Sequence, residues 1–247
     1  MRRPSIRPMA LALCCLLAVI LTGCGKTEQT AQEPEKQTIQ SECPAWERAA
    51  VTADAQGEPC FTLSPEEFLQ RYNTVWTGQG GDALPALDQW MDYGVGRAAY
   101  EGGTAGHQYL SLGDESNYAE PFLALCVTED GTQVKEVVTG LSQKNYGEGP
   151  GGVFQTKTYC ALQALLPGLD QAGFDELYQV LFADGTYAEA GTEVLPLRVY
   201  YQDGLACYGT LQIGSCDQIH LRAADQALLD WWQNVGVEVM QGIPGMA

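Results

Sequence analysis

The chain has 247 residues, with 31 Asp and Glu against 13 Lys and Arg, so its formal net charge is −18. This acidic excess excludes the basic surface that nucleic-acid binding requires, and we expect no nucleic-acid partner. Apolar residues make up 45% of the chain and charged residues 18%, a balance typical of a chain that buries a core rather than of a disordered one.

The opening segment has the three parts of a secretory signal. Three arginines precede an uncharged apolar stretch over 9–21, and two small residues, Thr22 and Gly23, follow it. This stretch of 13 residues is too short for a transmembrane helix, which needs about 20 apolar residues to cross a bilayer. We therefore predict a signal peptide over 1–23 that is removed from the mature protein.

The end of the signal is more specific. Leu21-Thr22-Gly23-Cys24 resembles the lipobox of bacterial lipoproteins, in which an apolar residue and two small residues precede an obligatory cysteine. The resemblance implies cleavage between Gly23 and Cys24, with Cys24 becoming an N-terminus that carries acyl chains such as palmitate. It implies a location on the extracytoplasmic face of the cell membrane, and it assigns no family to the mature domain. The alternative is a plain secreted protein in which Cys24 is incidental.

An anchor of this kind fits the charge of the mature chain. Removal of Arg2, Arg3 and Arg7 changes the formal charge from −18 to −21, because every acidic residue follows Cys24. Anionic head groups repel such a chain, whereas two or more acyl chains hold a protein stably at a bilayer. The predicted membrane partner is therefore bound through acylated Cys24.

Composition divides the mature chain into a tether and a body. Residues 24–58 are rich in Gln, Glu, Thr and Ala, and we predict a lipidated N-terminus with a flexible tether. The body, over 59–247, contains a loop of four glycines and a proline over 147–152. This loop separates two halves, over 59–146 and 153–247.

The first half begins with a clearly marked helix. Ser64 has the residue type of an N-cap, Pro65 fits the first helical position, and Glu67 completes a capping box. Apolar residues then recur at helical spacing to about Trp76, and a second helix is expected over 83–93. Strand-like runs follow, with a hairpin turn between the last two, at 107–112, 122–128 and 133–141.

The second half has the same order of helices before strands. Helical patterns cover 154–166 and 170–182, and a closing helix is expected over 223–234. The strands between them are predicted at 195–202, 205–213 and 218–222, and the alternation within 205–213 predicts one covered and one solvated face. We therefore predict an α+β fold, with antiparallel sheet and helices on one face. The shared order admits two similar α-β halves, and the alternative is that the resemblance is only the apolar stripe that any amphipathic helix shows.

Six cysteines remain after the signal and the anchor are set aside: Cys43, Cys60, Cys126, Cys160, Cys207 and Cys216. An exported protein with an even number of cysteines admits disulfides, and the pairs suggested here are Cys43–Cys60 and Cys207–Cys216. The alternative is a set of buried free thiols, since a free cysteine packs as a small apolar residue.

No motif in the sequence points to catalysis. There is no Cys-x₂₋₄-Cys spacing among these six cysteines, and no two histidines stand four residues apart, so we predict no metal site. No cofactor or hydrolase motif is present. Pairs of carboxylates such as Asp88 and Asp92 are in principle suited to acid–base catalysis. In so acidic a chain such pairs arise by chance, and we interpret them as part of a solvated surface. The two histidines, His107 and His220, lie on predicted strands, and the pattern around His220 directs it away from the core into solvent.

The sequence thus predicts a membrane-anchored lipoprotein with a binding or structural role at the cell envelope, and no catalytic residue is assigned. Tyrosines in the strands and in Gly-rich loops suit an envelope protein or a carbohydrate as partner. The alternative is a cell-envelope hydrolase whose site assembles only in three dimensions. A solute receptor of an importer is disfavoured, because a body of about 190 residues lacks two repeated lobes around a hinge.

Overall fold

The computed structural model describes residues 45–98, 102–111, 121–142, 152–183, 186–189, 195–213 and 216–246. The predicted signal, Cys24, Cys43 and most of the glycine-rich loop lie outside this set. Within it, no helix combines the length and the apolar character that a membrane span requires.

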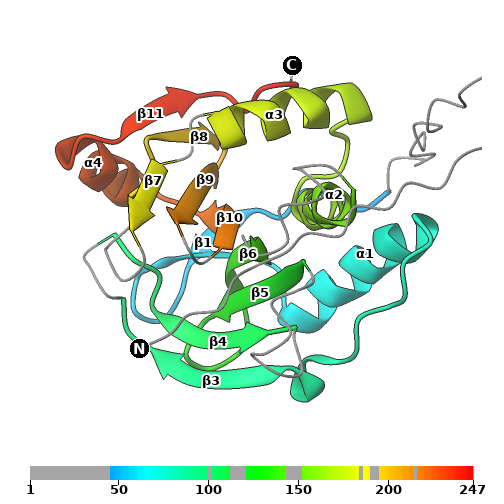
Figure 1. Ribbon diagram of the computed structural model, residues 1–247. Helices are drawn as coiled ribbons and strands as arrows, with labels where there is room; N and C mark the ends of the chain where they lie inside the picture. The colour runs from blue at the N-terminus through cyan, green and yellow to red at the C-terminus, as the bar shows by residue number, and fades with distance from the viewer. Residues whose placement is uncertain are drawn as a thin grey trace, which may run out of the picture. The chain divides into compact units, whose positions relative to one another are not determined.

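The described residues form four α-helices, one short 3₁₀ helix and eleven strands (Figure 1). The helices are α1 (Pro65–Gly78), η1 (Leu87–Gln89), α2 (Val153–Leu165), α3 (Gln171–Ala183) and α4 (Gln226–Asn234). The strands are β1 (Val51–Ala53), β2 (Pro59–Phe61), β3 (Met91–Gly96), β4 (Gly106–Leu110), β5 (Phe122–Val127), β6 (Val134–Ser142), β7 (Thr186–Glu189), β8 (Arg198–Gln202), β9 (Leu205–Ile213), β10 (Cys216–Ala223) and β11 (Glu238–Gln241).

Most strands belong to one large sheet, and the predicted α+β class is confirmed. Its order is β11-β8-β9-β10-β6-β5-β4-β3, while β1 and β2 pair with each other as a separate hairpin. The sheet is mixed rather than purely antiparallel, because β11 runs parallel to β8 and β7 runs parallel to β9. Strand β9 pairs with β8 along its first part and with β7 along its last part.

The two halves predicted from the sequence meet inside this sheet. The first half contributes a four-strand antiparallel meander, β3-β4-β5-β6, and the second a three-strand antiparallel meander, β8-β9-β10. The last strands of the two meanders, β6 and β10, pair antiparallel over seven residues. Because one hydrophobic core also draws on both halves, neither half forms a separate folded unit.

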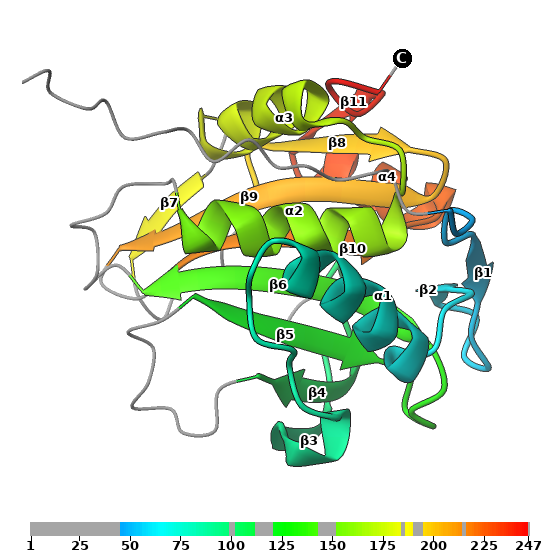
Figure 2. The same ribbon diagram turned by 90° about the vertical axis from the view of Figure 1, so that its right-hand side faces the viewer.

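The helices cover both faces of the sheet. Helices α1, α2 and α3 lie on one face (Figure 2), whereas α4 lies on the other. The alternation of β9 follows this arrangement, since Leu205 and Cys207 join the core under the first three helices and Ala206 and Tyr208 pack under α4. The prediction of helices on one face is therefore wrong for α4. The predicted solvated face is also wrong at Tyr208, whose ring lies 5.6 Å from that of Trp232.

Local sequence signals account for the start of α1. The Ser64 hydroxyl accepts a hydrogen bond from the Glu67 backbone N–H at 3.1 Å, as the predicted N-cap requires. The predicted helix over 83–93 is wrong, because the Asn73 side chain on α1 binds both backbone groups of Leu84, at 2.8 and 2.9 Å. Pro85 follows directly and also disfavours a helix there, so only one 3₁₀ turn forms.

The body begins earlier in the chain than predicted. The Ala49 N–H donates to the Leu165 carbonyl at 2.9 Å, and the Trp46 indole donates to the Gln163 carbonyl at 3.0 Å. Together with the β1–β2 hairpin, these contacts attach residues 45–58 to α2 and to the sheet. The predicted boundary of the tether at residue 58 is therefore corrected.

Candidate functional site

A row of buried polar side chains crosses the sheet on the face that α4 covers. Arg222 on β10 lies directly opposite Glu136 on β6, and His220, two residues before Arg222, lies opposite Tyr208 on β9. Glu136 and Arg222 are both buried. Because buried charges are costly unless they are paired and hydrogen-bonded, the partners of this row determine what it does.

Glu136 is the best-bonded member of the row. Its Oε1 accepts from the Tyr208 hydroxyl at 3.1 Å and lies 2.8 Å from His220 Nδ1, and the Thr104 hydroxyl donates to the same carboxylate. Burial alone would raise the pKa of Glu136. The hydrogen bond and charge of His220 and the charge of Arg222 outweigh burial, so the pKa is lowered to about 2. The carboxylate therefore stays ionised inside the protein.

His220 connects this carboxylate to a hydroxyl group. Its Nε2 lies 3.0 Å from Thr210 Oγ1, and its ring stacks on that of Tyr208 with 4.6 Å between the centroids. The side chain points away from the core under α1–α3, as expected, but it is only 15% exposed, so the expectation of a solvated His220 is wrong. Thr210, His220 and Glu136 form a hydroxyl–imidazole–carboxylate chain.

Arg222 holds a loop segment against this face. Its two terminal nitrogens donate to the carbonyls of Gly102 and Gly103, and its guanidinium lies 5.7 Å from the centre of the Trp232 ring. Gly102 in turn packs against Trp231 of α4. A Cβ at Gly102 would lie 1.9 Å from Trp231 Cζ3, so a larger residue at this position would have to displace the indole.

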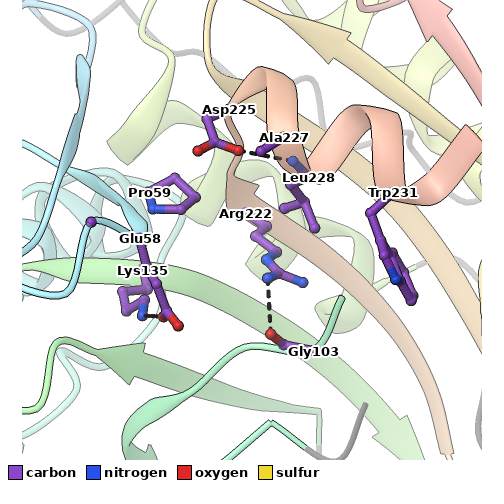
Figure 3. Close-up of a pocket in the computed structure, with 10 residues that line it drawn as sticks. Glu58, Pro59, Gly103, Lys135, Arg222, Asp225, Ala227, Leu228 and Trp231 are labelled. Atoms are coloured by element: carbon purple, nitrogen blue, oxygen red, sulfur yellow. Dashed lines mark hydrogen bonds and ion pairs between the residues drawn. The ribbon is translucent and has the colours of Figure 1, made fainter. Parts of the chain in front are cut away.

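A pocket opens beside Arg222, between the β1–β2 hairpin, the sheet and α4 (Figure 3). Its volume is about 290 Å³. Figure 3 shows Arg222 near the centre, with Glu58 and Lys135 on one side and Trp231 on the other. The lining residues are Gly57, Glu58, Pro59, Gly103, Lys135, Arg222, Asp225, Ala227, Leu228 and Trp231.

Local structure fixes the charged residues of the pocket. Lys135, whose side chain is 6% exposed, forms ion pairs with Glu58 and, at 3.3 Å, with Asp54. Asp54 also accepts the backbone N–H of Glu58 at 2.8 Å, which shapes the β1–β2 turn. Asp225 caps α4, because its Oδ1 accepts the Leu228 N–H at 2.9 Å.

The other histidine lies elsewhere. His107 Nε2 is 2.5 Å from Asp92 Oδ1 near the β3 edge of the sheet, and its ring stacks on Tyr109 at 4.5 Å. Hydrogen bonds from the Gly94 N–H and from His107 lower the pKa of Asp92. Strands β5 and β6 separate His107 from His220, so the structure does not bring the two histidines together.

The cysteines in the described part of the chain are Cys60, Cys126, Cys160, Cys207 and Cys216, and all five are buried free thiols. The predicted Cys207–Cys216 disulfide is wrong. Cys207 lies opposite Leu221, five residues along β10 from Cys216, or about 17 Å at strand spacing, whereas a disulfide needs Cα atoms within about 7 Å. Cys60 is free here, and its suggested partner Cys43 lies outside the described residues.

The described residues contain no cluster of three His, Cys, Asp or Glu side chains that could hold a metal ion. Comparison with known proteins adds no family, because the chain matches no protein-family model, no curated protein and no solved structure. The site is therefore interpreted from its geometry.

Sequence reasoning missed this pocket, although two signals were present. Lys135 and Glu136 interrupt an apolar strand between Val134 and Val137, and charges inside such a strand require partners. Asp225 precedes the apolar pattern of the closing helix as an N-cap does. Neither signal reveals that the β1–β2 hairpin, which is distant in sequence, completes the pocket.

Proposed function

We propose that this protein is a lipid-anchored, extracytoplasmic binding protein of a bacterial envelope, and that the pocket between the β1–β2 hairpin and α4 is its ligand site. The observation that carries the proposal is the pocket itself, which combines an aromatic wall with charged groups held in fixed positions. Such a combination of apolar walls and a few placed polar groups is typical of small-molecule sites.

The lipobox at Leu21-Thr22-Gly23-Cys24 supports the anchor. Acylated Cys24 would bind the bilayer, and the chain between Cys24 and residue 45 is long enough to hold the body away from the head groups. A site at the envelope then meets small molecules, carbohydrate or protein from outside the cell.

The pocket supports binding rather than catalysis. Lys135 and Arg222 are engaged by carboxylates and carbonyls, so they fix the shape of the site. The described lining residues include no Ser, Thr, Cys or His, so the nucleophile and base of serine or cysteine hydrolases are not found among them.

The hydrolase alternative rests on one observation, the chain from Thr210 through His220 to Glu136. His220 is not among the described residues that line the pocket, and Thr210 is buried, so this chain suits a structural role. Release of soluble fragments from purified cell wall by the wild type but not by Thr210→Val would favour the hydrolase. Equal, background release by both favours binding.

The anchor is tested by detergent phase partitioning of the full chain made in a bacterial host. Wild type is expected in the detergent phase, and Cys24→Ser in the aqueous phase or as uncleaved precursor. Cys43→Ser is the matched control, since it removes a nearby thiol without touching the lipobox, and it should partition as wild type does. Equal partitioning of wild type and Cys24→Ser, with both chains fully processed, would contradict the proposal that Cys24 carries a lipid anchor.

A further inference from the structure

We propose that the ligand of the pocket is a small organic amine, a positively charged ammonium group carried on an apolar or aromatic portion. The inference rests on the proposed binding function and deepens it. Three properties of the pocket support the inference: its cations already have partners, its carboxylates can accept further hydrogen bonds, and its wall is apolar and aromatic.

The cations of the pocket already have partners. Lys135 is bound by the carboxylates of Glu58 and Asp54. Arg222 donates to the carbonyls of Gly102 and Gly103 and lies opposite the ionised Glu136. An anionic ligand would have to displace these groups, so neither cation is available as an anion receptor.

The carboxylates of Asp225 and Glu58 can still accept hydrogen bonds from a ligand. Asp225 uses Oδ1 for the helix cap, and within the described part of the chain its Oδ2 accepts no hydrogen bond. The Glu58 side chain is 49% exposed, although one oxygen contacts Lys135. The carboxylates of Glu58 and Asp225 line the pocket together with Lys135 and Arg222, so the lining itself has no net formal charge, but it lies in a chain whose formal charge is −18. This field favours a positive charge.

The apolar and aromatic lining of the pocket suits an apolar or aromatic portion of the ligand. Pro59, Ala227 and Leu228 provide apolar surface, and Trp231 provides an aromatic face, which attracts a cation. The N-terminus of α4 would oppose a cation, but Asp225 caps it and reverses the local sign. The volume of about 290 Å³ is at the lower end for ligand sites and suits one ring rather than a peptide.

The experiment uses three probes that share a phenylethyl skeleton and differ in the head group: phenethylamine, 2-phenylethanol and 3-phenylpropionate. Each is titrated calorimetrically into the detergent-solubilised full chain, with titration into the same detergent subtracted. Phenethylamine is expected to bind about tenfold more tightly than the alcohol, and the carboxylate most weakly.

Two variants remove one carboxylate each. Asp225→Asn keeps a good N-cap, and Glu58→Gln changes an exposed side chain, so both are expected to fold. Each should weaken phenethylamine binding about threefold and leave 2-phenylethanol unchanged. Asp230→Asn is the matched control, since Asp230 lies on the same helix, is exposed and contacts Gln226, and this substitution should change neither affinity.

The outcomes separate the two proposals. Binding of the alcohol or the carboxylate as tightly as the amine, or no difference between Asp225→Asn, Glu58→Gln and Asp230→Asn, would overturn the amine and leave a binding pocket. Failure of all three probes to bind would overturn the amine and the proposed ligand site together.

Discussion

The two faces of the large sheet bury different kinds of side chain. Under α1, α2 and α3 the sheet buries aromatic and aliphatic side chains such as Phe68, Phe154 and Leu125, each at most 1% exposed. Under α4 it buries Glu136, His220 and Arg222 beside a pocket. The first face holds the fold together by removing apolar surface from water, and the second holds charged groups in place beside the pocket proposed as the ligand site.

Polar groups on the two faces differ in how many partners they have. On the α1–α3 face, the Thr139 hydroxyl contacts the Thr158 hydroxyl at 2.9 Å, and Thr158 also donates to the Phe154 carbonyl. On the α4 face, Glu136 is bonded to Tyr208, His220 and Thr104 at once. Four substitutions, two on each face, test the contrast between an apolar core on one face and a charged network beside the pocket on the other.

The largest effect is expected from Phe68→Ala on the α1–α3 face. Phe68 is fully buried in α1, so the substitution removes a large apolar side chain and leaves a cavity. The free energy of unfolding should fall by about 3–5 kcal/mol, measured by urea denaturation. Leu197→Ala, at a side chain that is 56% exposed, is the control and should change it by less than about 0.5 kcal/mol. Equal effects would contradict the assignment of the core.

On the α4 face, Glu136→Gln should cost about 3 kcal/mol at pH 7, because it removes the ionised carboxylate that lies opposite the buried Arg222 and next to His220. The pH dependence identifies the cause. The pKa of Glu136 is lowered from 4.5 to about 2 on folding, so its stabilising contribution is present above pH 4.5 and is lost as the pH falls towards 2. The difference between wild type and variant should therefore shrink over that range. A constant difference from pH 7 to pH 3 would exclude the charge as its origin.

A smaller effect is expected from Gly102→Ala, which introduces a methyl group 1.9 Å from Trp231. The clash should lower stability by about 1–3 kcal/mol and displace the aromatic wall of the pocket. Binding of phenethylamine should weaken in the same variant. Unchanged stability and unchanged affinity would show that the contact between Gly102 and Trp231 does not shape the site.

The smallest effect is expected from Thr139→Val on the α1–α3 face. The shape is kept and Thr158 retains its bond to the Phe154 carbonyl, so the loss in unfolding free energy should be about 1 kcal/mol. A loss as large as that of Glu136→Gln would remove the distinction between the two faces. Thermal unfolding of both variants at the same pH provides the comparison.

Local signals predicted the local structure well. The N-cap at Ser64 placed the start of α1, and Asp203 and Gly204, where both φ angles are positive, form the tight turn that joins β8 to β9, a turn typical of an Asp-Gly pair between two strands. In both cases a few neighbouring residues decide the geometry, so the sequence is sufficient.

Tertiary contacts decided what the sequence did not predict. The helix expected over 83–93 does not form because the Asn73 side chain binds both backbone groups of Leu84. The face of β9 expected to be solvated is covered because α4 folds back over Tyr208. For the same reason the pocket was missed, since it joins Glu58, Arg222 and Trp231 from distant parts of the chain.

Amide NMR of the detergent-solubilised chain titrated with phenethylamine tests most directly whether the ligand site lies on the α4 face. The predicted result is saturable shifts concentrated at residues 57, 58, 103, 135, 222 and 225–231, with α1 and α2 unaffected. Saturable shifts centred on α1 or α2, or no saturable shift at the α4 face, would contradict this placement of the ligand site.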